Sequence, residues 1–271
     1  MNKLRVVELF AGIGAQACAL ERLGIPFESL VCEINPHSYN GYCAIHGPTE
    51  NLGDITKVEH LPPCDLLTYS FPCQDLSIGG KQKGMKEGSG TRSSLLWEVE
   101  RLLNDMKNRR CLPEVLLMEN VDAILTKKNK PYLDKFIIRL NDLGYESSYA
   151  VLNAKDYGVP QNRKRCFMVS TLTMGHFVFP KGFELKNNLK DLEERDVPES
   201  SYLTEEQLTD FKRHYRRDNK LSEKENKLIQ TGVVDPNGYQ IKNRVYSDIG
   251  ISPAITTKID QMPKIQVSDN D

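Results

Sequence analysis

A cysteine at the end of a predicted strand is the residue of this sequence best suited to covalent chemistry. Cys73 follows the apolar run 66–69, and the glycine-rich, basic segment 78–84 comes soon after it. The run predicts a short buried strand, and the segment predicts a loop. A thiolate is the strongest common nucleophile near neutral pH, provided that nearby positive charge lowers the pKa of the thiol. A lone cysteine at the end of a core strand is usually a small buried hydrophobe, so nucleophile and core residue both stay open at this step.

Glycines and carboxylates that could hold a nucleoside also follow predicted strands. Gly12 and Gly14 lie in a tight turn before a predicted helix, where backbone can approach a ligand closely. Glu33 ends the next predicted strand, the usual place of a carboxylate that binds ribose hydroxyls. Asp54 closes a third unit, at a place suited to an adenine amino group. We therefore predict a nucleoside-containing cofactor, with close helix packing as the other interpretation of the glycines.

Strands and helices alternate as far as residue 171, which predicts an α/β fold with a doubly wound, parallel sheet. The carboxyl ends of parallel strands line one crevice, so Cys73, Glu119 and the cofactor residues are expected to meet there. Glu119 alone could equally make a structural hydrogen bond. The predicted strands cover residues 5–10, 29–34, 66–69, 114–118, 148–153 and 166–171, and the predicted helices cover residues 15–23, 36–46, 94–106 and 132–143.

Composition excludes several classes of protein. Hydrophobic residues make up 39% of the chain, charged residues 27%, and the formal net charge is −1, so charge alone indicates no polyanionic partner. The seven cysteines show no CxxC pair and no zinc-like spacing, which predicts reduced thiols and no metal site. No apolar run is long enough for a bilayer, and the N-terminus does not resemble a signal peptide. We predict a cytoplasmic protein with no membrane partner.

Four segments resemble successive motifs of the C5-cytosine DNA methyltransferases of bacterial restriction-modification systems. Each motif is short, but four in the family's order with sensible spacing are a strong signal. The resemblance implies a Rossmann-like, S-adenosylmethionine-dependent methyltransferase sheet. The four segments are residues 10–14, residues 71–74 with 80–84, residues 119–121 and residues 157–165.

The resemblance implies a covalent mechanism at a cytosine flipped out of double-stranded DNA. The Cys73 thiolate would add to C6 of the base, and Glu119 would hydrogen-bond the N3 and N4 edge. Arg165, and more indirectly Arg163, would hold the O2 side and stabilise charge that develops there. The activated C5 would then attack the methyl group of S-adenosylmethionine, and loss of the C5 proton would expel the thiolate.

The resemblance also assigns binding residues by position. Ile34 stands where many relatives have an aromatic residue, so a weaker apolar contact with adenine is expected. The residues implied for S-adenosylmethionine are Phe10, Gly12, Gly14, Glu33, Ile34, Asp54, Pro72 and Leu96. The residues implied for DNA are Gln74, Ser77, Lys81, Lys83 and Arg92.

The C-terminal part departs from the family pattern. Residues 244–257 look like the element that opens the target-recognition region, but the rest of that region, an arginine-containing motif and a final helix with an Asn-Ser pair are not found. We therefore expect a catalytic and cofactor-binding domain over residues 1–180 and a small, partial target-recognition region over residues 181–271. A truncated enzyme and a split enzyme completed by a second polypeptide are the two explanations.

Three other functions compete with this prediction. A tRNA cytosine methyltransferase shares these motifs, although the loop after Cys73 and the element at Arg244 favour DNA. A degenerate relative that only binds nucleic acid or a partner would not need the chemical residues, all of which are present. A nicotinamide dehydrogenase would leave Cys73 and Glu119 unexplained, and its glycine motif is incomplete because position 17 holds alanine.

Overall fold

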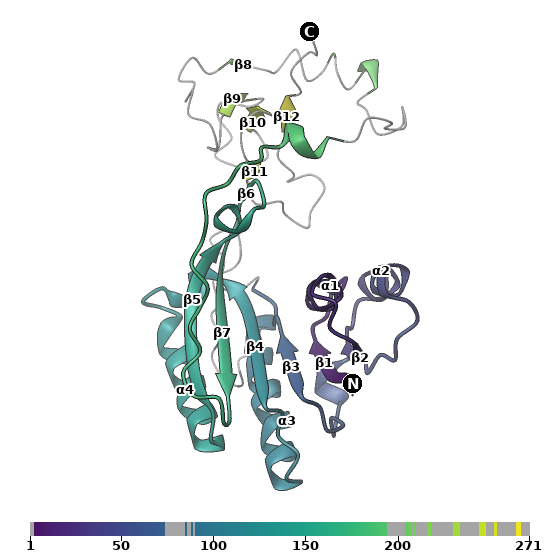
Figure 1. The fold of residues 1–271 in the computed structure, drawn as a ribbon, viewed down its shortest axis with the longest axis vertical. Coiled ribbons are helices and arrows are strands. Elements are labelled where there is room, and N and C mark those ends of the chain that lie inside the picture. Colours follow the sequence, from purple (N-terminus) through teal and green to yellow (C-terminus); the bar gives the residue numbers. More distant parts are fainter. Residues whose placement is uncertain are drawn as a thin grey trace. The chain divides into compact units, whose positions relative to one another are not determined.

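The chain divides into two compact units (Figure 1). The computed structural model describes residues 3–73, 85, 88, 90–193, 204–206 and 209, together with short strands between residues 216 and 266. The first unit comprises residues 1–152 and 165–180, and the second comprises residues 153–164 and 181–271. Residues 153–164 therefore cluster with the C-terminal part of the chain. The functional division expected at residue 180 stays a prediction.

A six-stranded mixed sheet, in the order β2-β1-β3-β4-β7-β5, forms the centre of the first unit. β1 pairs in parallel with β2 and β3, and β3 pairs in parallel with β4. This confirms the α/β class and the Rossmann-like sheet. The strands are β1 (Leu4–Leu9), β2 (Phe27–Cys32), β3 (Leu66–Tyr69), β4 (Val115–Val121), β5 (Glu146–Asn153) and β7 (Lys164–Thr171).

The expectation of a wholly parallel sheet is wrong at β7, which runs antiparallel to β4. A parallel return needs a crossover connection, usually a helix of a dozen or more residues. Residues 154–163 provide only the 3-10 helix η4 (Ala154–Tyr157) and the strand β6 (Gln161–Asn162). The chain therefore turns back beside β5 in the opposite direction.

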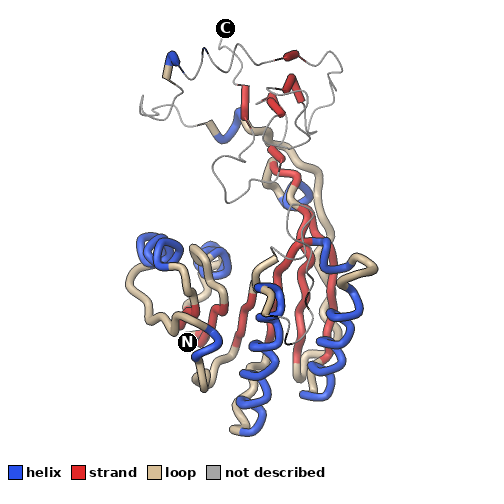
Figure 2. The backbone as a smooth tube through the Cα atoms, turned by 180° about the vertical axis from the view of Figure 1, so that it is seen from behind, coloured by secondary structure: helices blue, strands red, loops and turns tan. Residues whose placement is uncertain are grey.

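Four α-helices flank the sheet (Figure 2). Two of them begin or end on a local signal. The Asn35 side chain accepts from the backbone N–H groups of His37 and Ser38 at the start of the second helix, and Gly144 in a left-handed conformation ends the fourth. The four predicted helices are confirmed, with ends that differ by a few residues. They are α1 (Ala15–Arg22), α2 (Pro36–His46), α3 (Leu96–Asn108) and α4 (Lys130–Leu143).

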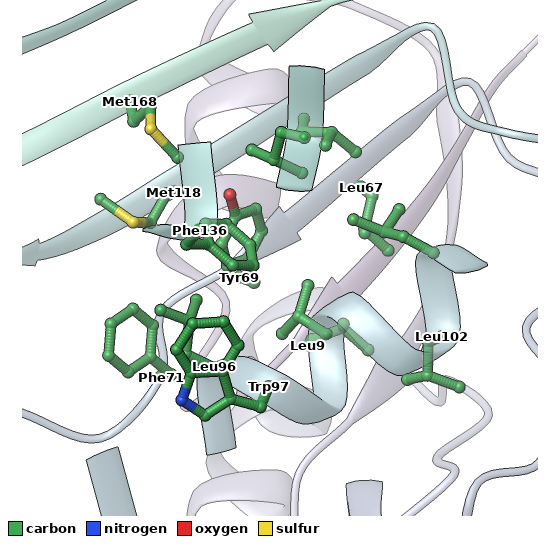
Figure 3. Close-up of a cluster of buried hydrophobic side chains, with 14 of the residues drawn as sticks. Leu9, Leu67, Tyr69, Phe71, Leu96, Trp97, Leu102, Met118, Phe136 and Met168 are labelled. Carbon is green, nitrogen blue, oxygen red and sulfur yellow. The ribbon is translucent and has the colours of Figure 1, made fainter. Parts of the chain in front are cut away.

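The larger hydrophobic core lies between the sheet and the helices α3 and α4. Figure 3 shows Leu9, Leu67 and Tyr69 from the strands beside Trp97 of α3 and Phe136 of α4. Side chains alternate across a strand, so residues two apart share a face. Burial of each large apolar side chain contributes about 1.5–3 kcal/mol, and this core fixes the strand ends from one side.

A smaller cluster packs α1 and α2 against the opposite face. It contains Ala17 of α1, Tyr42 of α2 and Val31 of β2. Glu8 lies between Val7 and Leu9 in β1 and so faces this cluster, where the Tyr42 hydroxyl donates to its Oε1 at 2.6 Å. The end of β1, just before its glycine turn, is thus packed against α1 and α2 on this face.

Short strands make up the described part of the second unit beyond residue 209. Four of them form a sheet in the order β12-β10-β9-β8, and β11 (Ser252–Pro253) pairs in parallel with β6. No helix in the described part of the chain has the length and apolarity to cross a membrane. The four sheet strands are β8 (Arg216–Arg217), β9 (Gln230–Val233), β10 (Arg244–Ser247) and β12 (Lys264–Gln266).

Candidate active site

The turn after β1 concentrates unusual backbone conformations. Phe10, Gly12 and Gly14 have φ angles of 58°, 59° and 83°. The left-handed conformation costs a residue with a side chain about 1–2 kcal/mol, so Phe10 is strained. Its N–H donates to the Cys32 carbonyl at 2.8 Å, which ties the turn to the end of β2. Strain of this kind persists where surroundings enforce it and is common at binding sites.

The two glycines of this turn meet different surroundings. A Cβ atom on Gly14 would lie 2.5 Å from His46 Nε2 and 2.7 Å from Tyr42 Cε2, so close packing on α2 requires glycine there. A Cβ atom on Gly12 would meet no described atom within 4 Å. The packing interpretation therefore accounts for Gly14, whereas Gly12 borders open space of the kind that a ligand needs.

Glu33 lies just beyond β2 with its carboxylate held by backbone donors. Oε2 accepts from the Gly12 N–H at 2.9 Å, and Oε1 accepts from the Asn35 N–H at 2.7 Å. The carboxylate is therefore fixed against the glycine turn. Each oxygen keeps a lone pair that could accept a ribose hydroxyl.

Asp54 is fixed in a similar way by the residues that follow it. Its Oδ1 accepts from the backbone N–H and the hydroxyl of Thr56, at 3.0 and 2.8 Å, and caps the 3-10 helix η1 (Ile55–Lys57). These hydrogen bonds, first that of the Thr56 side chain, lower the pKa of Asp54 below its usual range. The carboxylate is thus kept ionised and able to accept from an adenine amino group.

The apolar residues assigned to the cofactor differ in exposure. Ile34 is 70% exposed, as a contact with a ligand requires, and Pro72 is half-buried. Leu96 is 0% exposed and belongs to the core, while Leu95, one residue earlier, is only partly buried. Ile13, in the middle of the glycine turn, is 59% exposed; the sequence analysis missed it, although an apolar residue between two turn glycines is a usable signal.

Cys73 follows β3 in a segment held by buried donors from other elements. The carbonyl of Phe71 accepts from Asn120 Nδ2 at 3.0 Å, and the carbonyl of Pro72 accepts from the Ser93 hydroxyl at 2.7 Å. Asn120 and Ser93 are themselves buried. Sequence reasoning missed both positioning contacts, because a single asparagine or serine carries no spacing signal.

Cys73 also differs from the buried thiols. Cys32, Cys64 and Cys166 are buried, and burial raises their pKa values to about 12, 12 and 11, which keeps them neutral and unreactive. Cys73 is half-buried. None of the seven cysteines forms a disulfide, and the described residues contain no group of three or more histidine, cysteine or acidic side chains that could hold a metal ion.

Glu119 and Arg165 form an ion pair on one face of the sheet. The distance from Arg165 Nε to Glu119 Oε1 is 3.0 Å, and the side chains are 19% and 23% exposed. Arg165 lies opposite Val121 in the antiparallel register of β4 and β7, two residues along from Glu119. Diagonal neighbours of this kind point to the same face and are within reach of long side chains. The antiparallel direction of β7 therefore brings this arginine to the carboxyl end of β4.

Of the other residues assigned to the base and to DNA, the structure describes Arg163 and Arg92. Arg163 belongs to the second unit, where its carbonyl accepts from the Ala154 N–H at 3.0 Å. Arg92 is exposed in the 3-10 helix η2 (Arg92–Leu95). The remaining DNA assignments, Gln74, Ser77, Lys81 and Lys83, lie outside the described residues.

Comparisons with known proteins identify the family of this chain. The model of the family "C-5 cytosine-specific DNA methylase" matches residues 4–270. Type II methyltransferase M2.ScrFI of Lactococcus lactis subsp. cremoris is 34% identical over 264 residues, which cover 76% of this chain and 72% of that protein. Orphan methyltransferase M.SssI of Spiroplasma monobiae is 51% identical over 212 residues, which cover 76% of this chain and 52% of that protein.

Solved structures share the fold. The crystal structure of the S. pombe Dnmt2 methyltransferase has a TM-score of 0.65 at 21% identity and covers 100% of this chain and 78% of its own. The structure of the Entamoeba histolytica methyltransferase EhMeth has a TM-score of 0.62 at 19% identity, over 75% of this chain and 64% of its own. At such identities the likeness supports the sheet and its order. The match of the family model over residues 4–270 and the 34% identity to M2.ScrFI show that the chain belongs to the C5-cytosine-specific DNA methyltransferases.

Proposed function

We propose that this chain transfers a methyl group from S-adenosylmethionine to C5 of cytosine in double-stranded DNA through a covalent adduct with Cys73. The observation that carries the proposal is the pairing of Glu119 with Arg165 at the end of β4, the strand beside β3, from which Cys73 follows. The reaction needs a nucleophile, a proton-bearing group and a cation at one base, and these three residues supply them.

Cys73 provides the nucleophile. Cytosine C5 is itself a weak nucleophile, so the Cys73 sulfur first forms a bond to C6 and pushes electron density onto C5. S-adenosylmethionine, when bound, would supply an electrophilic methyl group to C5, its sulfur–methyl bond breaking to leave S-adenosylhomocysteine. The C5 proton then leaves to a base, the C5–C6 double bond re-forms, and the carbon–sulfur bond breaks to return the thiolate. The locked carbonyls of Phe71 and Pro72 keep the thiol at one place throughout.

Glu119 and Arg165 act on the edge of the same base. Glu119 hydrogen-bonds the N3 and N4 edge and favours the neutral, protonated adduct, which makes the ring enamine-like. Arg165 orients the Glu119 carboxyl group through their 3.0 Å contact, and its other N–H groups are suited to the developing charge on O2. By resemblance, Arg163 is assigned a more indirect role on the O2 side of the base.

The cofactor site fits an adenosyl group. Glu33 is held by two backbone N–H groups and is suited to accept from ribose hydroxyls. The ionised Asp54 is suited to accept from the adenine amino group, and the exposed Ile34 to cover the ring. Phe10, Gly12, Pro72 and Leu96 complete the assignment by resemblance.

DNA recognition is the second part of the proposal. M.SssI is about twice as long as the segment of it that matches this chain. We propose that a second polypeptide is the partner of this chain and supplies the recognition motifs not found in the sequence. Adding a separately expressed C-terminal part of M.SssI to this chain tests it.

The decisive experiment measures tritium transfer from labelled S-adenosylmethionine to mixed-sequence duplex DNA, with tRNA as a competing substrate. Cys73→Ser is expected to abolish transfer. Cys111→Ser, at another half-buried thiol, is the matched control and should retain it. Absence of transfer by a folded chain, with or without the added polypeptide, would overturn the proposal, and transfer to tRNA alone would replace its substrate.

A further inference from the structure

One side-chain amide joins the two loops that carry the proposed cofactor carboxylates. Asn51 Oδ1 accepts from the backbone N–H groups of Glu33 at 3.0 Å and of Gly53 at 2.9 Å. Asn51 Nδ2 donates to the Glu33 carbonyl at 3.0 Å. A single residue thus binds both main-chain polar groups of Glu33 and the residue before Asp54.

The side-chain amide of Asn51 extends a short backbone pairing at the end of β2. β2 ends at Cys32, and the backbone of residues 50–52 pairs with its last part: the Val31 N–H donates to the Glu50 carbonyl at 3.0 Å, and the Leu52 N–H donates to the Val31 carbonyl at 2.8 Å. Among the described residues, this bridge is the only strand-like pairing between residues 50–53 and the end of β2. The Asn51 amide, which has one donor side and one acceptor side like a peptide group, continues the pairing to Glu33.

We infer that Asn51 is a positioning residue for S-adenosylmethionine, and this inference rests on the proposed function. It sets the backbone of Glu33 so that the carboxylate reaches the Gly12 and Asn35 N–H groups, and it sets Gly53 so that Asp54 follows at a fixed distance. The groups that contact ribose and adenine, Glu33 and Asp54, are thereby kept at fixed positions relative to each other. Preorganisation of this kind strengthens binding because the ligand does not have to order the loops.

The fold does not depend on this amide alone. The bridge between Val31 and Asn51 is made by backbone atoms, and the Cys32 thiol donates separately to the Gly53 carbonyl at 3.2 Å. Asn51 is only partly buried, so water can replace its side chain. Removal of the side chain is therefore expected to loosen Glu33 without unfolding the unit.

The experiment titrates S-adenosylhomocysteine, which binds without turnover, into the purified chain by calorimetry. Asn51→Ala should raise the Kd about tenfold, the equivalent of about 1.4 kcal/mol. Asn104→Ala is the matched control, since the Asn104 amide also donates to a backbone carbonyl, that of Glu100, but on the exposed side of α3. Its Kd should stay within about twofold of the wild-type value.

A double-mutant cycle separates positioning from general loosening. If Asn51 acts through Glu33, Asn51→Ala should raise the Kd much less in a Glu33→Gln background than in the wild type. An equal rise in both backgrounds, or no rise at all, would overturn the inference while wild-type binding leaves the proposed function standing. Absence of binding by the folded wild type and by the control would overturn the proposed function and this role of Asn51 together.

Discussion

Two carboxylates of the same sheet are held in different ways. We call the end of β2, where Glu33 lies, the cofactor edge, and the end of β4, where Glu119 lies, the base edge. Both oxygens of Glu33 accept from backbone N–H groups, those of Gly12 and Asn35. Glu119 is instead paired with the Arg165 side chain. A backbone donor is fixed with its turn, whereas an arginine side chain can exchange one acceptor for another. The cofactor edge is therefore built as a rigid receptor, and the base edge can rearrange when a charged or hydrogen-bonding substrate enters.

The largest effect is expected at the base edge. Glu119→Gln keeps the shape of the side chain but cannot donate an acidic proton, so kcat for methyl transfer should fall about 10²–10⁴-fold. The Kd for S-adenosylhomocysteine should not change, because Glu33 and Asp54 are untouched. Steady-state kinetics and calorimetry check the two halves of this prediction.

Glu114→Gln is the control for that substitution. Glu114 lies just before β4, at the opposite end from Glu119, and its carboxylate accepts from the Thr173 N–H at 2.9 Å. This variant should keep its kcat. A rise in the cofactor Kd of Glu119→Gln as large as the loss of kcat would show that the two edges are one coupled site.

The glycine turn offers a test within the cofactor edge. Gly14→Ala should cost about 3 kcal/mol of folding free energy, because the new methyl group meets His46 and Tyr42 and the backbone conformation is left-handed. Gly12→Ala should cost only about 1 kcal/mol, from the backbone alone. Its methyl group should instead weaken binding of S-adenosylhomocysteine. Urea unfolding and calorimetry would contradict this view if Gly12→Ala were the less stable variant.

Glu8 is a third carboxylate, and it differs from the other two in being fully buried. The Tyr42 hydroxyl donates to Oε1, and Oε2 has no hydrogen-bond partner in the described part of the chain. Burial raises the pKa of Glu8, against the smaller opposing effects of the Tyr42 hydroxyl, the Ala17 backbone and His46. The folded protein therefore binds this proton more tightly than the unfolded chain, and its contribution to stability is full below the ordinary glutamate pKa and is lost as pH rises through the raised value.

Glu8→Gln isolates that contribution. The free energy of unfolding of the variant, relative to the wild type, should increase as pH rises from about 4 to 7, by at most about 1.4 kcal/mol per pH unit. Other carboxylates cancel in the difference, including Asp65 and Asp105, whose pKa values are lowered by hydrogen bonds from Arg5 and Arg109. A flat difference would mean that Glu8 is ionised in the folded state across this range.

Local patterns account for what the sequence could predict. Alternation and helical spacing located the strands β1, β3 and β4 and the four helices, because those periods depend on nearby residues alone. The positions of the strand ends then predicted that Glu33, Cys73 and Glu119 lie at the same end of the sheet, the end where the parallel strands finish. The direction of β7 could not be read in the same way, since it depends on how a connection without a helix closes in space.

The same reasoning explains the residues that the sequence analysis missed. Ser93, Asn120 and Asn51 act through single hydrogen-bonding groups, and such groups have no period. Leu96 was assigned to the cofactor by resemblance, and the structure places it in the core just after the 3-10 helix η2, so that assignment stays a prediction. The exposed position at that junction cannot be chosen from a pattern that assumes one helix type.

The smallest effect is expected at Tyr69, which ends β3 just before the Cys73 segment. Its ring packs edge-on against Phe136 with centroids 6.0 Å apart, and its buried hydroxyl has no hydrogen-bond partner among the described residues (Figure 3). An unsatisfied buried hydroxyl destabilises the fold, so Tyr69→Phe should leave stability unchanged or raise it by about 1 kcal/mol. Tyr145→Phe, which removes a hydroxyl that donates to the Pro113 carbonyl at 2.7 Å, should instead lower it by about 1 kcal/mol in urea unfolding. Equal losses in both variants would mean that the Tyr69 hydroxyl is bound after all. Unchanged methyl transfer in Tyr69→Phe would show that Cys73 is placed by the bonds of Asn120 and Ser93 to the backbone, so that the nucleophile, unlike Glu119, is held in the rigid manner of the cofactor edge.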